Sequence, residues 1–299
     1  MTSPRWLLLG AVLFTVLAWS SAFIVIRGVS PFLDGGPLAL GRLLVGTVAL
    51  GFLVLIARRW VWPNRREWLQ LAIYGVAWFG VYNVALNTAE QTLDAGTAAM
   101  IVNIGPILIA LGAGVFLGEG IPKWLAIGAA VAFIGVILIG IGTSLSSGTA
   151  HPVDVVGAVL ALAAAVTYAI GVLVQKPVVR RIPGIQATFI GCAIGMLVCL
   201  PFSGLLIEQL AVASAPVWWS VVYLGVVPTA LAFSTWAYAL KRMPAGQLGI
   251  STYLVPPIAI LVGFLAFREI PHVLALVGGV VCLIGVAVSR RRPRVVAPA

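Results

Sequence analysis

The chain alternates between long apolar runs and short segments that contain proline, glycine and charged residues. Each run approaches the roughly 20 consecutive apolar residues that an α-helix needs to cross a lipid bilayer. The pattern predicts an all-α polytopic membrane protein with ten transmembrane helices, at residues 6–29, 38–57, 68–89, 95–117, 123–143, 154–176, 185–203, 217–240, 245–267 and 271–289. The seventh is the least regular, because Pro201 and the stretch 204–215 suggest an interfacial turn.

The composition supports this interpretation. The 299 residues are 62% hydrophobic and 9% charged, with a mean hydropathy of +1.13, whereas soluble domains contain about 25% charged residues. Most of the surface must therefore face lipid, and no room remains for a separate soluble domain. The first run is longer than the apolar region of a signal peptide, so we expect it to be retained as a span.

The distribution of basic residues predicts the orientation in the membrane. With the N-terminus in the cytoplasm, all but three of the 18 Lys and Arg residues fall in cytoplasmic segments, as the positive-inside rule requires. The exceptions are Arg27, Arg42 and Arg268. We expect both termini on the cytoplasmic side of a bacterial inner membrane. We attribute the net charge of +10 to this orientation, and not to a nucleic-acid partner.

The two halves of the sequence repeat one another. Residues 87–139 align without a gap with residues 237–289, an offset of 150, and proline and glutamate positions coincide, as in Pro106 with Pro256. This self-similarity predicts two five-helix repeats, residues 1–150 and 151–299. Because five is odd, the second repeat enters the membrane from the opposite side. Inverted repeats are typical of secondary transporters, whose halves exchange roles as the site opens to each side in turn.

Several of these features also resemble a known family. The L-G-E turn at 117–119 and the F-R-E turn at 267–269 each precede a G-x-x-x-x-x-I-G-V helix, and Trp19 and Tyr168 occupy the first and sixth spans. Over nearly the whole chain this arrangement resembles the EamA repeats of the drug/metabolite transporter superfamily, including its YddG-type amino-acid exporters. The resemblance implies secondary transport, most often export of amino acids or other metabolites.

Prolines interrupt the middle of two predicted spans. Pro106 lies in the fourth, and Pro256 and Pro257 lie in the ninth. A proline removes one backbone hydrogen bond and kinks the helix, which frees carbonyl groups at bilayer depth. Breaks at matching positions of two halves predict a binding site near the membrane midplane. The alternative is a kink that only improves helix packing, since proline is common in transmembrane helices.

Aromatic, amide and hydroxyl side chains gather near these breaks. In the third span Tyr74, Trp78 and Tyr82 share one helix face. The predicted substrate-binding residues are Trp19, Trp78, Tyr82, Asn83, Asn103, Tyr168, Trp236, Ser251 and Tyr253. Individually, interhelical hydrogen bonds or an interfacial aromatic belt could explain each of them. Together they predict an aromatic-lined cavity for neutral or zwitterionic solutes, such as hydrophobic or aromatic amino acids.

The few charged residues near the spans receive mostly structural interpretations. Glu119 and Glu269 lie just before the next helix, where an acidic residue stabilises the helix N-terminus. Arg27 and Arg42 are close enough to the outer face to snorkel or to pair with an acid, and the alternative is contact with a substrate carboxylate. Glu90 and Asp94 are read as solvated loop charges. The alternative role for these four acidic residues is proton coupling, although no acidic residue falls at the centre of a predicted span.

No motif in the chain indicates catalysis, a metal or a cofactor. The sequence contains no H-E-x-x-H, Walker or G-x-S-x-G motif, and Cys192, Cys199 and Cys282 read as packing residues inside apolar runs. We therefore expect a secondary transporter working by alternating access, with the bilayer and a small solute as its partners. A lipid-modifying membrane enzyme and a passive solute channel are the alternative hypotheses. The sequence leaves the oligomeric state open.

Overall fold

The computed structural model describes residues 5–93, 98, 101–147, 155–267 and 272–291, which fold into helices without a β-strand. The protein is an all-helical, multi-pass membrane protein. Eight helical segments of the described chain are long and apolar enough to cross a membrane: Arg5–Val29, Gly35–Ala57, Arg65–Gln91, Lys123–Gly142, Val155–Arg181, Gly184–Ala211, Ala215–Arg242 and Ala245–Val262. Two shorter apolar helices, Gly105–Phe116 and Val273–Ser289, lie within the fourth and tenth predicted spans.

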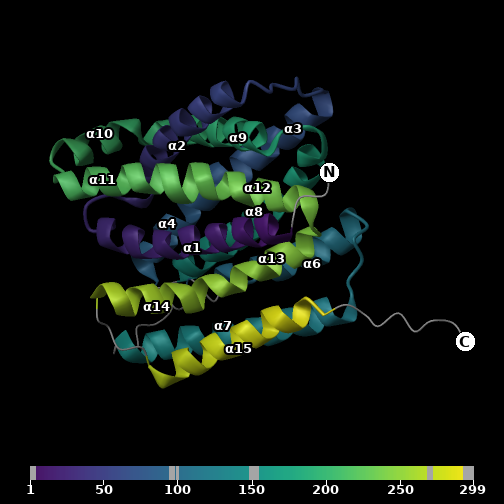
Figure 1. Ribbon diagram of the computed structural model, residues 1–299. Coiled ribbons are helices and arrows are strands. Elements are labelled where there is room, and N and C mark those ends of the chain that lie inside the picture. Colours follow the sequence, from purple (N-terminus) through teal and green to yellow (C-terminus); the bar gives the residue numbers. More distant parts are fainter. Residues whose placement is uncertain (1–4, 94–97, 99–100, 148–154, 268–271, 292–299) are drawn as a thin grey trace, which may run out of the picture.

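The helices of the described residues are, in chain order, α1 (Arg5–Val29), α2 (Gly35–Ala57), α3 (Arg65–Tyr74), η1 (Gly75–Val81), α4 (Tyr82–Thr92), α6 (Gly105–Phe116), α7 (Lys123–Ser147), α8 (Val155–Arg181), α9 (Gly184–Cys199), η2 (Leu200–Phe202), α10 (Ser203–Ala211), α11 (Ala215–Leu224), η3 (Gly225–Leu231), α12 (Ala232–Arg242), α13 (Ala245–Ser251), η4 (Thr252–Leu254), α14 (Val255–Phe267) and α15 (Val273–Ser289). Figure 1 shows that α1 begins and α15 ends at the same end of the molecule.

Several predicted boundaries differ from those of the structure. The sixth span extends beyond residue 176 to Arg181, and the seventh continues through η2 and α10 to Ala211, where a turn was predicted. The third begins earlier than predicted because Asn64 caps it. The Asn64 side chain accepts a hydrogen bond from Glu67 N at 2.9 Å, and Glu67 Oε2 accepts one from Asn64 N at 2.8 Å. This reciprocal capping box fixes the start of α3.

Two π-helical segments occupy matching positions in the two halves. η1 joins α3 to α4, and η3 joins α11 to α12, with the 150-residue offset of the sequence repeat. A π-turn leaves carbonyl groups without their usual partners, and side chains supply substitutes here. Asn83 Nδ2 donates to Trp78 O and Phe79 O, at 3.2 and 2.9 Å. Because π-helices are rare and often mark functional sites, their recurrence indicates a functional site at the level of η1 and η3.

The proline positions coincide with interruptions of the helices. Described residues before α6 form a turn, so Pro106 lies in the first turn of α6. The ninth span likewise changes to a 3₁₀ turn, η4, before α14 begins with Pro256 as its second residue. At these positions a helix does not need the missing N–H group. Pro106 and Pro256 therefore each lie in the first turn of a new helix, at the positions where the sequence predicted breaks.

Helices from the two halves interleave. α1 packs against α12 and α14 of the second half, and α8 packs in the corresponding way against α4 and α6 of the first half. α2 and α9 also contact each other. The space between the halves is therefore bounded by elements of both.

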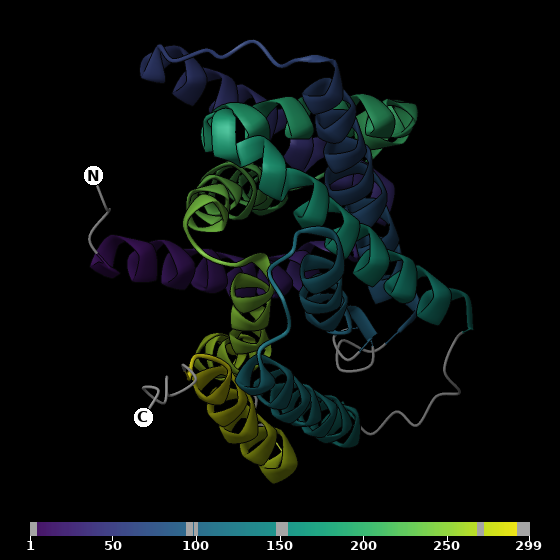
Figure 2. The same ribbon diagram turned by 90° about the vertical axis from the view of Figure 1, so that its right-hand side faces the viewer.

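The fifth and tenth predicted spans, α7 and α15, lie side by side at one edge of the molecule (Figures 1 and 2). A Cβ atom on Gly128 would lie 2.4 Å from Ser289 N, and one on Gly142 would lie 2.5 Å from Ala275 N. The earlier residue of α7, Gly128, thus faces the end of α15, and the later residue, Gly142, faces its beginning. The two helices therefore run antiparallel. Glycine allows the backbones to touch, which is the usual way in which membrane helices pack tightly.

Candidate functional site

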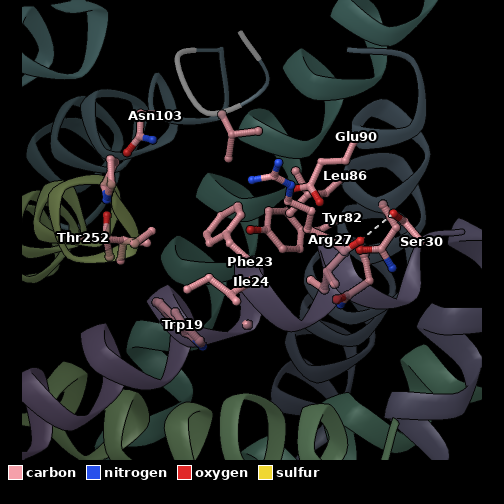
Figure 3. A pocket seen from close by; sticks show the side chains of 18 of the residues that line it. Trp19, Phe23, Ile24, Arg27, Ser30, Tyr82, Leu86, Glu90, Asn103 and Thr252 are labelled. Carbon is pink, nitrogen blue, oxygen red and sulfur yellow. Dashed lines mark hydrogen bonds between the residues drawn. The ribbon is translucent and has the colours of Figure 1, made fainter. Parts of the chain in front are cut away.

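A cavity of about 350 Å³ lies between the two halves, lined by α1, α2 and α4 of the first half and by α8, α12 and α14 of the second. It extends from Trp19, in the middle of α1, to the exposed residues Arg27, Gln91 and His272 at one end of the molecule. Figure 3 shows Glu90, Tyr82, Arg27 and Ser30 together on one side of this cavity, with Asn103 and Thr252 on the opposite wall.

Aromatic rings form the floor of the cavity. Trp78 contacts Phe233, Tyr168 and Trp19, with ring centroids 4.9, 5.0 and 6.1 Å apart. Trp236 lies behind this layer, with its ring centroid 5.1 Å from that of Trp19 and 5.7 Å from that of Trp78. Edge-on and tilted contacts at these separations are favourable for aromatic pairs. The floor, named here as Trp19, Trp78, Tyr168 and Phe233, closes the cavity toward the other end of the molecule.

Hydrogen bonds from α1 connect the floor to irregular backbone in the second half. Trp19 Nε1 donates to Pro228 O in η3 at 3.1 Å, and Ser20 Oγ donates to Val255 O at the start of α14 at 3.2 Å. Tyr253 Oη donates to Asn103 O at 3.0 Å, so the two helix breaks also contact each other. α1 is therefore tied to both irregular segments of the second half, η3 and the start of α14.

Two charged residues inside the cavity correct the sequence interpretation. Arg42 does not snorkel to the surface: it is 6% exposed, it lines the cavity, and its Nε and Nη2 donate to Thr229 Oγ1 at 3.2 and 3.1 Å. Glu90 is not a solvated loop charge, because it is half-buried within α4 and lines the same cavity. Asp94 lies outside the described residues. The cavity therefore contains more charge than the sequence suggested.

Most of the predicted site residues meet at the cavity. Trp19, Trp78, Tyr82, Asn83, Asn103, Pro106, Tyr168 and Pro256 all line it. Among these, Asn83 uses its amide group to hold the π-turn, and Tyr82 is half-buried with its ring centroid 6.1 Å from that of Tyr168.

Four predicted residues do not line the cavity. Trp236 lies behind the floor and Tyr253 is fully buried between the helix breaks. Ser251 faces away, toward the end of α15, because its hydroxyl accepts a hydrogen bond from Arg290 Nη2 at 3.1 Å. Pro257 packs toward Gly279 on α15. The 3₁₀ turn before α14 rotates Pro257 away from the face that a continuous helix predicts.

Sequence reasoning missed Phe233, Thr252 and His272 as cavity residues, gave Glu90 another role, and gave Arg42 contact with a solute only as the alternative to snorkelling or pairing. Phe233 was detectable, because it stands 150 positions after Asn83 in the repeat. A charge within an apolar run, such as Arg42, is itself a signal of function.

The end of the molecule opposite the cavity mouth is closed by a polar cluster. We call it the basic end, because it carries Arg58, Arg59, Arg65, Arg66, Lys123, Arg180, Arg181, Lys241 and Arg242. There Lys176 Nζ donates to Leu240 O and Met243 O, both at 2.6 Å, and lies 3.7 Å from Glu119 Oε1.

Glu119 is a helix cap, but of a different helix from the one that follows it. Its two oxygens accept hydrogen bonds from Ala245 N and Gly246 N, at 2.9 and 3.3 Å. It therefore caps α13 of the second half, where an acidic group at the N-terminus is favourable. Glu269 lies outside the described residues. No group of His, Cys, Asp or Glu side chains in the described part of the chain could hold a metal ion.

Comparison with known proteins identifies relatives over most of the chain. A "Probable terminal-alkyne amino-acid exporter" of Streptantibioticus cattleyicolor is 35% identical over 285 residues, which cover 94% of this chain and 93% of that protein. The threonine/homoserine exporter RhtA of Escherichia coli is 30% identical over 235 residues, 74% of this chain and 72% of that protein. An uncharacterized transporter of Bacillus subtilis, YdfC, is 33% identical over 273 residues, 90% of this chain and 86% of that protein.

A crystal structure of another protein shares the fold, with a TM-score of 0.75 at 20% sequence identity, covering 94% of this chain and 98% of that one. The family described as EamA-like transporters matches the chain twice, at residues 5–141 and 155–291. These matches confirm the resemblance found in the sequence. The chain belongs to the EamA-like transporter family.

Proposed function

We propose that this transporter exports amino acids by alternating access through the cavity between its two halves. The observation that carries the proposal is a cavity lined by both halves, open at one end and closed by an aromatic floor toward the basic end. Family membership makes the chain a transporter and not an enzyme, which leaves the lipid-modifying hypothesis without support. A passive channel needs a continuous path, whereas here the floor separates the cavity from the basic end.

Ten spans in two inverted five-helix repeats, residues 1–150 and 151–299, are part of the proposal. The contacts between α7 and α15 support the inversion. A Cβ on Gly128 would lie 2.6 Å from Gly285 O, and one on Gly278 would lie 2.6 Å from Gly135 O. Gly128 and Gly278 are 150 residues apart, and so are Gly135 and Gly285, so the offset converts the first contact into the second. A two-fold relation between antiparallel helices requires such an exchange. The Cys282 Sγ–H group likewise donates a hydrogen bond to Ala132 O at 3.3 Å, and these two residues are separated by the same offset.

The proposed location is the cytoplasmic membrane of a bacterium, with both termini in the cytoplasm. The clustering of Lys and Arg at the basic end supports this orientation, because cytoplasmic loops of membrane proteins are enriched in these residues. In that orientation the cavity faces outward. The observed arrangement then corresponds to the state that releases an exported solute.

The proposed solutes are hydrophobic or aromatic amino acids and related zwitterions. Two relatives are named as exporters of amino acids, one for terminal-alkyne amino acids and one for threonine and homoserine. Tryptophan, tyrosine and phenylalanine rings of the floor offer an apolar surface for a side chain. The cavity volume of about 350 Å³ suits a single small molecule.

Growth of expressing cells on toxic amino-acid analogues tests the proposal. We expect cells that produce the protein to tolerate terminal-alkyne, aromatic or branched analogues at higher concentrations than cells with an empty vector. The internal concentration of the tolerated analogue should fall. Equal sensitivity to every analogue, with the protein present in the membrane at normal abundance, would contradict amino-acid export.

A further inference from the structure

We propose that Arg42 and Glu90 form the subsite that holds the charged head of a zwitterionic solute, with Arg42 binding the carboxylate and Glu90 the ammonium group. This inference rests on the proposed export of amino acids and adds the orientation of the solute. The head lies toward the cavity mouth, and the side chain lies against the aromatic floor.

Arg42 has hydrogen-bonding capacity that the protein does not use. A guanidinium group carries five N–H donors. In the described structure Nε and Nη2 both donate to a single acceptor, Thr229 Oγ1. That hydroxyl is occupied in turn, because it donates to Leu224 O at 2.8 Å. The remaining N–H groups of Arg42 have no acceptor among the described residues, although the side chain is only 6% exposed and lines the cavity.

Glu90 complements Arg42 on the same cavity wall. No described side chain donates a hydrogen bond to its carboxylate, and the ion pairs of the described residues, Lys176–Glu119 and Arg181–Glu67, lie at the basic end. The cavity thus contains a cation with spare donors and an anion with spare acceptors. A charge within a membrane span is costly unless it is compensated, so both groups favour a solute that carries the opposite charges.

The repeat supports a functional role for this pair over a structural one. At the 150-residue offset, Arg42 corresponds to Cys192 and Glu90 to Leu240. Both counterparts are buried and uncharged. The scaffold therefore folds at the equivalent positions without either charge. A feature that the fold does not need in one half is best explained by what the cavity binds.

The geometry of the rest of the cavity agrees with this orientation. Glu90 lies nearer the mouth than the floor, since it is close to the end of α4 and Trp78 lies three turns earlier on the same span. An amino acid with its head between these two charges directs its side chain toward Trp78 and Phe233. The planar guanidinium group of an arginine matches the geometry of a carboxylate better than the ammonium group of a lysine does.

Ligand binding to the purified full-length protein tests the proposal, with the fluorescence of the floor tryptophans as the readout. The best-bound of phenylalanine, leucine and threonine is compared with its amide, which lacks the carboxylate, and with its deaminated acid, which lacks the ammonium. A charge-assisted hydrogen bond contributes enough that loss of either group should raise Kd about tenfold or more. Arg42→Gln should weaken binding of the amino acid to the level of the amide, while leaving binding of the amide unchanged. Glu90→Gln should weaken binding of the amino acid to the level of the deaminated acid, while leaving binding of the deaminated acid unchanged.

Three further variants separate binding from folding. Thr229→Val removes the structural hydrogen bond of Arg42 but keeps the guanidinium, so it should retain the preference for a carboxylate. Arg42→Lys should restore part of the affinity, because it keeps the charge without the fork. Arg66→Gln, at an exposed position of α3, is the matched control and should bind as the parent protein does.

The possible results are distinguishable. If Thr229→Val reproduces Arg42→Gln, or if Arg42→Gln weakens the amino acid and its amide equally, Arg42 acts structurally and the inference is overturned. If Arg27→Gln abolishes the carboxylate preference instead, the subsite is assigned to the wrong arginine. Binding of amino acids without any dependence on the carboxylate refutes the subsite alone. Absence of amino-acid binding and transport in the parent protein refutes the proposed function as well.

Discussion

At the scale of single residues, the cavity combines rigid and accessible aromatic groups. Trp78 is 1% exposed and contacts five other aromatic rings, so it supports the floor as much as it faces the solute. Tyr82 is half-buried and lies higher on the wall. Replacement of Trp78 by alanine removes a buried ring from a core, which lowers the free energy of unfolding by about 3–5 kcal/mol. Tyr82 is therefore the better position for a test of binding.

We expect Tyr82→Ala to raise the KM for aromatic amino acids roughly tenfold, because it removes an apolar surface that a buried side chain contacts. The effect should be smaller for threonine, whose side chain covers less of the ring. Initial rates in proteoliposomes provide the measurement. Trp218→Ala, an exposed position on α11, is the control and should leave KM unchanged. An unchanged KM in the Tyr82 variant would remove this residue from the binding surface.

The sequence predicts which side chains face the cavity only where the helix is regular enough for its periodicity to hold. Trp19, Trp78 and Tyr168 meet as expected, because aromatic positions near the middle of spans are compatible with one central cavity. Pro257 does not line the cavity, because the preceding 3₁₀ turn changes the helix face and nothing in the local sequence specifies that rotation. Ser251 does not line it either, because its hydroxyl accepts a hydrogen bond from Arg290. Glu90 fails because α4 continues past it, so a residue expected in a loop becomes part of the wall.

At the scale of elements, irregular helices surround the cavity. The third and eighth spans contain π-segments, and the fourth and ninth are interrupted at proline. The sequence predicted the interruptions, because proline has a direct effect on the backbone. It did not predict the π-segments, since one inserted residue within a helix leaves the hydropathy pattern nearly unchanged. Such segments change their hydrogen bonding at low cost, as elements that move between two states must.

The cluster at the basic end holds α8, α12 and α13 together. Lys176 binds the carbonyl groups at the end of α12, and Glu119 binds the amide groups at the start of α13. We expect this cluster to keep the basic end closed while the cavity is open at the other end. At the 150-residue offset Lys176 corresponds to Ile26, so the same cation is missing at the cavity mouth.

Lys176→Met should shift the equilibrium toward opening at the basic end, because charge-assisted hydrogen bonds contribute about 1.5–3 kcal/mol. A cysteine at Leu248, which is buried on α13, should then react with a thiol reagent from the basic side about tenfold faster or more. Lys241→Met, an exposed position on α12, is the control and should react as the parent does. Equal labelling rates in folded Lys176→Met protein contradict the closing role.

At the scale of the whole molecule, alternation of hydropathy was enough to predict the helical membrane class and the approximate positions of the spans. Eight described segments meet the length and composition of a membrane span, and two shorter apolar helices accompany them. The repeat was visible in sequence because proline, glutamate and glycine recur at one offset. The depth of the cavity was not visible, because it depends on how far the interleaved helices of the two halves separate.

The proposed topology predicts which surfaces a membrane-impermeant thiol reagent can reach. A cysteine at Asn64, which caps α3 at the basic end, should be labelled only from the cytoplasmic side. A cysteine at Val212, which is 88% exposed after α10, should be labelled only from outside. The three native cysteines are buried and should give little background. External labelling at Asn64 would contradict the proposed orientation.

The account as a whole depends on a solute-binding cavity that opens alternately to the two sides of the membrane. Counterflow in proteoliposomes tests this most directly: vesicles loaded with an unlabelled amino acid are placed in a trace of the labelled one. Alternating access predicts transient accumulation of label, saturation with external amino acid, and loss of accumulation when the internal amino acid is omitted. Flux that rises linearly with concentration, and that does not respond to amino acid on the opposite side, would show a channel and contradict the account.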